Sequence, residues 1–442
     1  MQTPAAGNLR RVTLSSLFGS TIEWYDFFLY GTVAGMVFNK LYFPEGDPFI
    51  TTLLSYGVFA IGFLTRPLGA IIFGHFGDTL GRKKMLILTL VIMGGATVVI
   101  GLVPGYHQIG LWAPCLLILC RLIQGIGLGG EWGGAVLMTF ESAPEKHRAF
   151  FASIPQIGMS LGLLLASGAI GLASYLLPDE AFMSWGWRVP FILSGVFVII
   201  GTYIRKNVAE TEDFLKAQEA RKHAPKRIPL VELFRNNTKL VFTCMGMRLI
   251  DGVFFNIFGV FSLTYLTQNL NIPRDQAIVA ILASAFVMSF FIPFWGYMAD
   301  LWGRARIFAM GATLSALSAF PSFALMHNHP DNIWLVWAAI VIPFGIFHAA
   351  VFGTLSSVYS ECFDASVRYT GISFAYQISG VFAGGLTPVL ATIFSNMLGG
   401  RPWLICAYVL VIGLTSAACA LYLWRQTHGA GRVTVTNSVL IK

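Results

Sequence analysis

The chain has 442 residues, of which 56% are hydrophobic and only 11% are charged, and its mean hydropathy is +0.70. A soluble domain carries roughly 25% charged residues, so the composition excludes a soluble globular protein and indicates one that lies mostly in a lipid bilayer. The net charge of +8 would also suit a protein that binds nucleic acid, but the distribution of the charges along the chain argues against that class.

Twelve apolar stretches follow one another along the chain, each close to the ~20 residues that a membrane-spanning helix needs. The sequence therefore predicts an all-α membrane protein with twelve transmembrane helices. The first stretch carries Glu23 and Asp26, which distinguishes it from a cleavable signal peptide. The predicted spans are 12–38, 51–74, 85–103, 112–139, 150–177, 187–204, 238–267, 277–299, 307–326, 333–359, 369–397 and 403–424.

The 29 Lys and Arg residues are distributed unevenly between the two sides of the membrane. Those deep within spans are Arg66, Arg121 and Arg248, and those in or next to the loops after odd-numbered spans are Lys40, Arg188, Arg274 and Arg401. The others lie on the opposite side. Because basic loops stay in the cytoplasm, this bias predicts that both termini are cytoplasmic. The basic excess therefore reflects topology, and no nucleic-acid partner is expected.

No cofactor or metal site is expected from the sequence. The six cysteines form no CxxC pair and lie in or beside apolar spans, as small core residues do. The segment from Gly125 to Gly130 fits the pattern G-x-G-x-x-G, but no strand precedes it, so its glycines are interpreted as helix-packing residues. The sequence therefore does not predict an enzyme.

The second half of the chain repeats the first about 220 residues later. The loop after the second span carries Gly74, Asp78, Gly81 and Arg82, and the loop after the eighth span carries Gly296, Asp300, Gly303 and Arg304. Glu141 and Arg148 recur as Glu361 and Arg368, and Gln156 recurs as Gln377. The repeat predicts two pseudo-symmetric six-helix bundles, 1–204 and 238–424, with a cytoplasmic linker, 205–237, and a cytoplasmic tail, 425–442. Parallel repeats of this kind are typical of alternating-access carriers.

These loops, together with Arg121-x-x-Gln124-Gly125 in the fourth span, resemble the signature motifs of the major facilitator superfamily. The runs EWYDFFLYG (23–31), FLTRPLGAIIFGHFGD (63–78), GGEWGGA (129–135) and SWGWRVPF (184–191) resemble its metabolite:proton symporter family. His348 and LTQNLNIPRD (266–275) are most similar to the shikimate carriers of that family. The resemblance implies the major facilitator fold and proton-coupled uptake of a small polar organic acid. It also implies a monomer in a bacterial inner membrane.

Ionisable residues inside the spans are the first functional candidates, since each costs at least ~2.5–3.5 kcal/mol at the bilayer centre. Helical rise places Asp26 at the depth of Arg121, and Glu23 at the depth of Arg66, so the sequence predicts these two ion pairs. The resemblance implies that the acid of the first span and the arginine of the fourth span couple protons. Permanent pairs that only hold helices together remain the alternative. Glu131, near the end of its span, is predicted to be a structural or gate contact.

Arg248 is the candidate ligand for a substrate carboxylate, because guanidinium forms bidentate hydrogen bonds to planar oxyanions. A local pair with Asp251, three residues later on the same face, is the alternative. Polar side chains at mid-span, taken together, predict a central polar site; singly, each is more often a contact between helices. They are Tyr30, Gln124, Gln156, Asn256, His348, Tyr376 and Gln377. For His348, a buried core histidine is the alternative.

Other functions were weighed against proton-coupled uptake of a shikimate-like acid. A di- or tricarboxylate, an aromatic acid or betaine remains possible as the substrate. Proton antiporters that export hydrophobic compounds usually carry a Gly-x-x-x-Gly-Pro pattern in the fifth span, and here no Pro follows Gly158-Met-Ser-Leu-Gly162. A membrane sensor that does not transport is expected to add a large cytoplasmic domain, whereas the sequence after Trp424 is short.

Overall fold

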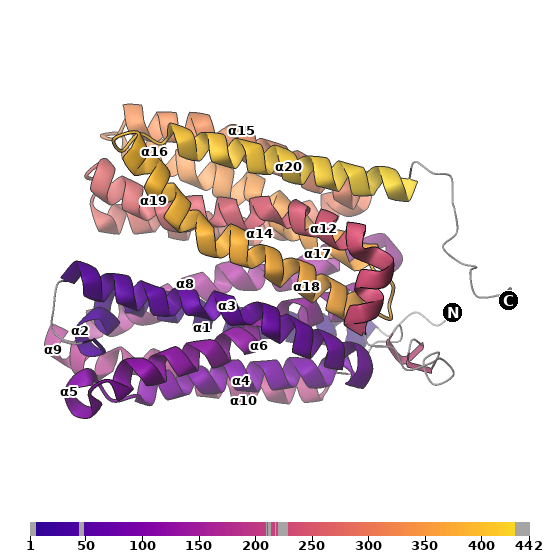
Figure 1. Ribbon diagram of the computed structural model, residues 1–442, viewed down its shortest axis with the longest axis horizontal. Coiled ribbons are helices and arrows are strands. Elements are labelled where there is room, and N and C mark those ends of the chain that lie inside the picture. Colours follow the sequence, from indigo (N-terminus) through magenta and orange to yellow (C-terminus); the bar gives the residue numbers. More distant parts are fainter. Residues whose placement is uncertain are drawn as a thin grey trace, which may run out of the picture.

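The computed structural model describes residues 6–43, 48–208, 210, 214–216, 218–219 and 229–428. Much of the predicted linker and most of the predicted tail therefore lie outside the described residues. Within the described residues every regular element is a helix (Figure 1).

The N-terminal half contains six long helical segments, several of them broken by a short turn or a π-helical stretch. Their elements are α1 (Ala6–Val33), η1 (Ala34–Phe38), α2 (Asn39–Leu41), α3 (Pro48–Leu80), α4 (Arg82–Leu102), α5 (Tyr106–Ile109), α6 (Trp112–Ser142), η2 (Glu145–His147), α7 (Arg148–Ser153), η3 (Ile154–Gln156), α8 (Ile157–Leu176), α9 (Asp179–Ala181), η4 (Phe182–Gly186) and α10 (Arg188–Lys206).

The C-terminal half repeats this plan, and π-helical segments interrupt three of its spans. Its elements are α12 (Pro229–Phe255), η5 (Asn256–Phe261), α13 (Ser262–Thr264), η6 (Tyr265–Asn269), α14 (Arg274–Trp302), α15 (Arg304–Asn328), α16 (Ile333–Ile340), η7 (Val341–Phe347), α17 (His348–Cys362), α18 (Arg368–Gly380), η8 (Val381–Leu386), α19 (Thr387–Met397) and α20 (Trp403–His428). Such π-helical segments are frequent at functional sites.

Ten helical segments of the described residues are long and apolar enough to cross a membrane. The remaining two predicted spans are the long helices α1 and α3, and α1 carries the buried carboxylates of Glu23 and Asp26. All twelve predicted spans are therefore helical, and the predicted fold class is confirmed.

The two halves lie side by side as separate layers of helices (Figure 1). We call the end of the molecule where α10 ends and α12 begins the linker end, and the opposite end, which carries α2, α9 and α16, the far end. The predicted linker differs from the structure in one respect, because α12 begins at Pro229. Asn237 breaks that helix with non-helical backbone angles (φ −131°, ψ 20°), so a short helix precedes the seventh span.

Glycines bring α3 and α6 into backbone contact. A Cβ added to Gly125 would overlap the carbonyl oxygen of Gly62, and one added to Gly129 would overlap that of Arg66. Small residues permit such close approach between membrane helices, where dispersion forces contribute much of the association. The Gly125–Gly130 segment lies inside α6, as its interpretation as a packing motif requires.

We predict that Gly125→Val destabilises the protein by about 1–3 kcal/mol, the usual cost of overpacking. The matched control is Gly95→Val on α4, because nothing lies within 4 Å of a Cβ added to Gly95. Thermal unfolding of the detergent-purified variants measures the difference. Equal midpoints for the two variants would contradict the proposed packing.

Candidate functional site

The first contact between the halves at the linker end is made by Asp78, near the C-terminal end of α3. Its carboxylate accepts hydrogen bonds from the backbone N–H of Tyr369 (3.3 Å), the backbone N–H of Thr370 (2.9 Å) and the Thr370 hydroxyl (2.8 Å). These are the first residues of α18, whose N-terminus carries partial positive charge. An acid of one half therefore caps a helix of the other.

The second contact repeats the first with the halves exchanged. Asp300, near the C-terminal end of α14, accepts hydrogen bonds from the backbone N–H groups of Ala149 and Phe150, each at 2.9 Å. These residues begin α7. Two pseudo-symmetric capping contacts thus join the halves at the linker end.

The local structure requires glycine at several positions of the repeated loops. Gly81 and Gly303 follow α3 and α14 with φ of 115° and 98°, a region that residues with a Cβ rarely adopt. A Cβ added to Gly74 would lie 2.9 Å from the Thr370 Cα, and one added to Gly296 would overlap the Ser153 side chain. The glycines therefore let each loop reach the opposite half.

The charged residues of the same loops form two further clusters. Arg82 pairs with Glu141, and Glu141 also pairs with Arg368 of the other half at 2.7 Å. In the C-terminal half, Arg304 pairs with Glu361 and lies 3.5 Å from Asp300. The Arg148 guanidinium instead lies over the Phe140 ring, at 5.2 Å. The structure thus brings together the charged residues of the repeated loops, for which we expect a gating role.

Gln156 and Gln377, which were predicted to line the site, join the halves in this structure. Gln156 Nε2 donates to the Phe352 carbonyl at 3.0 Å, and Gln377 Nε2 donates to the Leu128 carbonyl at 3.1 Å. Gln156 Oε1 accepts from Trp132 Nε1 at 2.8 Å. In this conformation both amides are engaged at the interface. Among the described residues, all hydrogen bonds that join the two halves lie either at the level of these two glutamines or closer to the linker end.

A stack of three side chains crosses the interface at the centre of the molecule. Tyr376 stacks on Trp132 with ring centroids 3.7 Å apart, and the Arg248 guanidinium covers the ring of Tyr376 at 3.9 Å. Arg248 is only 7% exposed, yet its Nε and Nη1 have no hydrogen-bond partner among the described residues. A buried guanidinium with unused donors is costly unless a ligand supplies acceptors.

Asp251 is shared between two neighbours. Its Oδ2 lies 3.6 Å from Arg248 Nη2, and its Oδ1 lies 3.2 Å from His348 Nε2. His348 is fully buried and stacks on Phe254, which fits the core-histidine interpretation. The Asn256 side-chain Nδ2 donates to the Gly252 carbonyl at 2.8 Å, and the Asn256 side-chain oxygen takes no part in this bond. The local pair of Arg248 with Asp251 therefore exists but is loose.

The predicted ion pair of Asp26 with Arg121 is wrong for this structure. Asp26 is fully buried, its Oδ1 accepts from the Ser194 hydroxyl at 2.5 Å, and its Oδ2 has no hydrogen-bond partner within the described part of the chain. Arg121 lies over the Tyr30 ring at 4.1 Å and donates to Gln124 Oε1 at 2.8 Å. Helical rise fixes the depth of these residues, but the direction of each side chain selects a nearer partner.

A polar chain runs through the space between these two residues. Gln124 Nε2 donates to the Thr97 hydroxyl at 2.7 Å, and Thr97 lies beside Asp26. The Thr97 hydroxyl donates to the Met93 carbonyl at 3.1 Å, and it has one proton that either Met93 or Asp26 can accept. A chain of polar contacts through Thr97 and Gln124 thus connects Asp26 with Arg121.

No salt bridge joins Glu23 and Arg66, the second predicted pair, among the described residues, although the two groups are close enough to interact electrostatically. Arg66 lies between two rings, 4.9 Å from the centroid of Phe27 and 4.1 Å from that of Phe63, and its Nε has no hydrogen-bond partner among the described residues. Glu23 is 3% exposed with Oε2 unpartnered. Cation–π contact with the two rings takes the place of the predicted carboxylate.

Two side chains of the site were not predicted from the sequence. Arg205, which was assigned to the linker, is 3% exposed and pairs with Glu131. Glu131 also accepts from the Thr89 hydroxyl at 2.7 Å. The signal available was the position of Arg205 directly after the sixth span, from which a long side chain can reach back along its helix. Trp132 lies in the run GGEWGGA (129–135), but its stacking on Tyr376 was not predicted.

Comparison with known proteins fits this architecture. Residues 12–228 match the family model described as Sugar (and other) transporter, and residues 244–439 match that of the Major Facilitator Superfamily. The chain belongs to the major facilitator superfamily, and its relatives are transporters rather than enzymes. The solved proton:xylose symporter XylE superposes with a TM-score of 0.74, covering 96% of each chain at 15% identity, which shows the shared fold.

Individual relatives show a more specific similarity than the family models do. The chain is 39% identical to the shikimate transporter of Escherichia coli K12, with 95% of each chain covered. It is 40% identical to the inner membrane metabolite transport protein YhjE of the same organism, with 88% of each covered. It is 33% identical to the proline/betaine transporter of Salmonella typhimurium over 87% of this chain and 77% of that protein. The resemblance stated from the sequence is confirmed.

We predict that Asp78→Asn and Asp300→Asn each open the linker end. An amide offers one neutral acceptor oxygen where the carboxylate offers two charged ones, so each change should cost about 1–3 kcal/mol of closure. Spin labels at the exposed positions 145 and 364 measure the separation of the halves. Asp275→Asn, at an exposed position on α14, is the control. An unchanged distance distribution in the double variant would contradict the capping contacts.

Proposed function

We propose that this protein is a proton-coupled symporter for a small hydroxylated monocarboxylate of the shikimate type. Arg248 carries the proposal, since it is a buried guanidinium with unpartnered Nε and Nη1 at the interface between the halves. A substrate carboxylate would supply an acceptor that these donors lack. The oxygen of Asn256 and, after the halves separate, the amides of Gln156 and Gln377 would serve the substrate hydroxyl groups.

Betaine is a weaker candidate because of how Tyr376 is used. Quaternary ammonium groups are recognised by the faces of aromatic rings. Both faces of the Tyr376 ring are in use, one by Trp132 and the other by Arg248. A di- or tricarboxylate would require a second cation, and Arg66 is the buried candidate. Export by antiport stays the alternative of another class, and no contact in the structure favours it.

We further propose that the linker end faces the cytoplasm of a bacterium, with the protein in the inner membrane and both termini inside. The distribution of basic residues supports this orientation. In that orientation, the contacts of Asp78 and Asp300 close the cytoplasmic side. One chain contributes both halves of the site, so a monomer suffices.

Asp26 is the proposed proton carrier. Its buried carboxyl has Ser194 on one oxygen and no hydrogen-bond partner on the other. A carboxyl group in a dry site changes its proton affinity when a cation approaches or leaves. The chain through Thr97 and Gln124 connects it to Arg121, so a rotation of Arg121 toward Asp26 would expel the proton.

Uptake by the reconstituted protein tests the function directly. Proteoliposomes with an inward proton gradient should accumulate labelled shikimate, and a protonophore should abolish the accumulation. Citrate and glycine betaine, added in excess, show whether the site prefers a monocarboxylate. Accumulation that continues unchanged with the protonophore would rule out proton coupling.

We predict that Asp26→Asn abolishes concentrative uptake and spares exchange of substrate across the membrane. The amide keeps the shape of the acid but cannot carry the proton. Ser194→Ala is the matched control, because it removes the hydrogen bond to Asp26 and keeps the acid. If Asp26→Asn accumulates shikimate like the wild type, the proton is carried elsewhere.

We predict that Arg248→Ala weakens binding by about 30- to 3,000-fold, because truncating a buried charged partner costs ~2–5 kcal/mol. Arg248→Lys should also lose affinity, since the ammonium lacks the planar fork. Isothermal titration of the purified variants with shikimate measures both. The double variant with Asp251→Ala separates the roles. Normal affinity in the double variant would mean that Arg248 only neutralises Asp251.

A further inference from the structure

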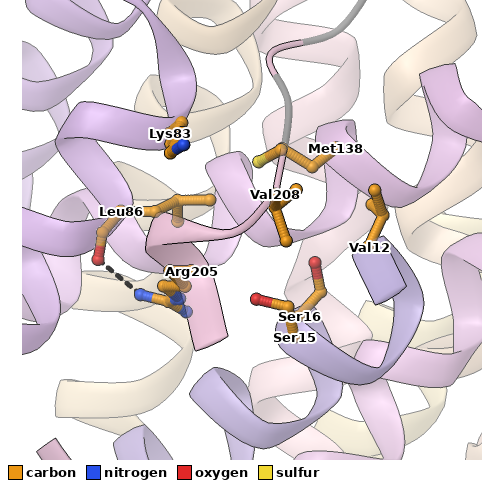
Figure 2. Close-up of a pocket in the computed structure, with 8 residues that line it drawn as sticks. All are labelled: Val12, Ser15, Ser16, Lys83, Leu86, Met138, Arg205 and Val208. Atoms are coloured by element: carbon orange, nitrogen blue, oxygen red, sulfur yellow. Dashed lines mark hydrogen bonds between the residues drawn. The ribbon is translucent and has the colours of Figure 1, made fainter. Parts of the chain in front are cut away.

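A small pocket lies at the linker end within the N-terminal half (Figure 2). Ser15 and Ser16 of α1 line one side, and Arg205 lies across from them, with Lys83 near the surface. Lys83 Nζ donates to the Lys206 carbonyl at 2.6 Å. Because all these residues belong to one half, the pocket is separate from the interface that Asp78 and Asp300 close.

Arg205 lines the pocket and forms an ion pair with Glu131, which lies behind it. Arg205 donates to the Leu86 carbonyl, as the dashed line in Figure 2 marks, and both of its terminal nitrogens reach Glu131. Glu131 is 1% exposed. A carboxylate therefore lies directly behind a cation that borders the pocket.

Arg205 also connects the pocket to α1. A Cβ added to Gly19 would overlap the Arg205 guanidinium, so that group fills the space over Gly19. Glu23 lies four residues further along, on the same face of the helix and about 6 Å deeper. Its Oε2 is buried without a hydrogen-bond partner. The charged groups that act on Glu23 are Glu131, Arg66, Arg205 and Asp26.

Resting on the proposed proton coupling, we propose that the proton leaves through the N-terminal half by way of Glu23, Glu131 and this pocket. The substrate leaves between the halves, so the two routes are separate. Glu23, which receives the proton from Asp26 three residues further along α1, transfers it to the Glu131 carboxylate, and Glu23 is then ionised. Protonated Glu131 then gives the proton to a water molecule that reaches it beside Arg205 from the pocket, and the resulting hydronium reaches bulk solvent.

Arg205 is the positioning residue for this transfer. It pairs with Glu131 while Glu131 is ionised, and it lies one helical turn from Glu23, with which it pairs after Glu23 loses the proton. During the transfer from Glu23 to Glu131, the carboxylate that is ionised therefore always has a cation beside it, and leaving it without one would be costly. The positive charges of Lys83 and Arg205 favour departure of the hydronium from the pocket.

The test compares concentrative uptake of labelled shikimate with its exchange in proteoliposomes that contain the full chain. Glu131→Gln should lower concentrative uptake by about 100-fold or more, the usual effect of removing a proton-transfer group. Exchange should be retained, because it needs no release of the proton. Glu145→Gln, at an exposed position of the same end, is the matched control and should retain both activities.

A second variant guards against a merely structural effect. Glu131→Gln leaves Arg205 buried without its counter-charge, whereas Glu131→Gln with Arg205→Gln removes both charges. The double variant should also lose concentrative uptake and keep exchange. Concentrative uptake at the wild-type level in either variant would overturn the route and leave the proposed symport intact. Loss of exchange from the double variant would also overturn it, because the pair would then be needed for substrate movement.

Discussion

Ionisable groups buried in a bilayer must find a counter-charge, a hydrogen-bond partner or a ligand, and the arrangement of this molecule follows from that requirement. At the linker end the requirement is met within the protein. Asp78 and Asp300 cap helices of the opposite half, and Glu141 joins Arg82 to Arg368. At the centre of the molecule the requirement is met only in part. Nitrogen donors of Arg66 and Arg248, and carboxylate oxygens of Glu23 and Asp26, have no hydrogen-bond partner among the described residues. The incomplete region is where a proton and an anion can be accommodated.

The two halves share the closing contacts but differ at the centre. The capping acids and the interface glutamines come in repeated pairs, so closure is nearly symmetric. The acid with an unused oxygen, Asp26, lies in the N-terminal half, and the stack that carries Arg248 is anchored in the C-terminal half through Tyr376. The proposed substrate and proton sites therefore lie in different halves. Motion of one half against the other then changes both environments at once.

The sequence predicted the fold and singled out the loop residues that join the halves at the linker end, for physical reasons. A repeated loop implies a repeated structure, and glycines at positive φ, such as Gly81 and Gly303, have few substitutes. Pairing inside the spans was predicted poorly. Helical rise places Asp26 level with Arg121, but the side chain of Ser194 on α10 is nearer. No pattern along one helix shows which side chain of another helix lies opposite.

The central claim is that substrate and protons enter together, and the external pH tests it most directly. Lightly buffered proteoliposomes without an imposed gradient should show a rise in external pH when shikimate is added, as each molecule carries a proton inward. Asp26→Asn proteoliposomes should show none. Shikimate entry by the wild-type protein with no change in external pH, or with acidification, would contradict the account.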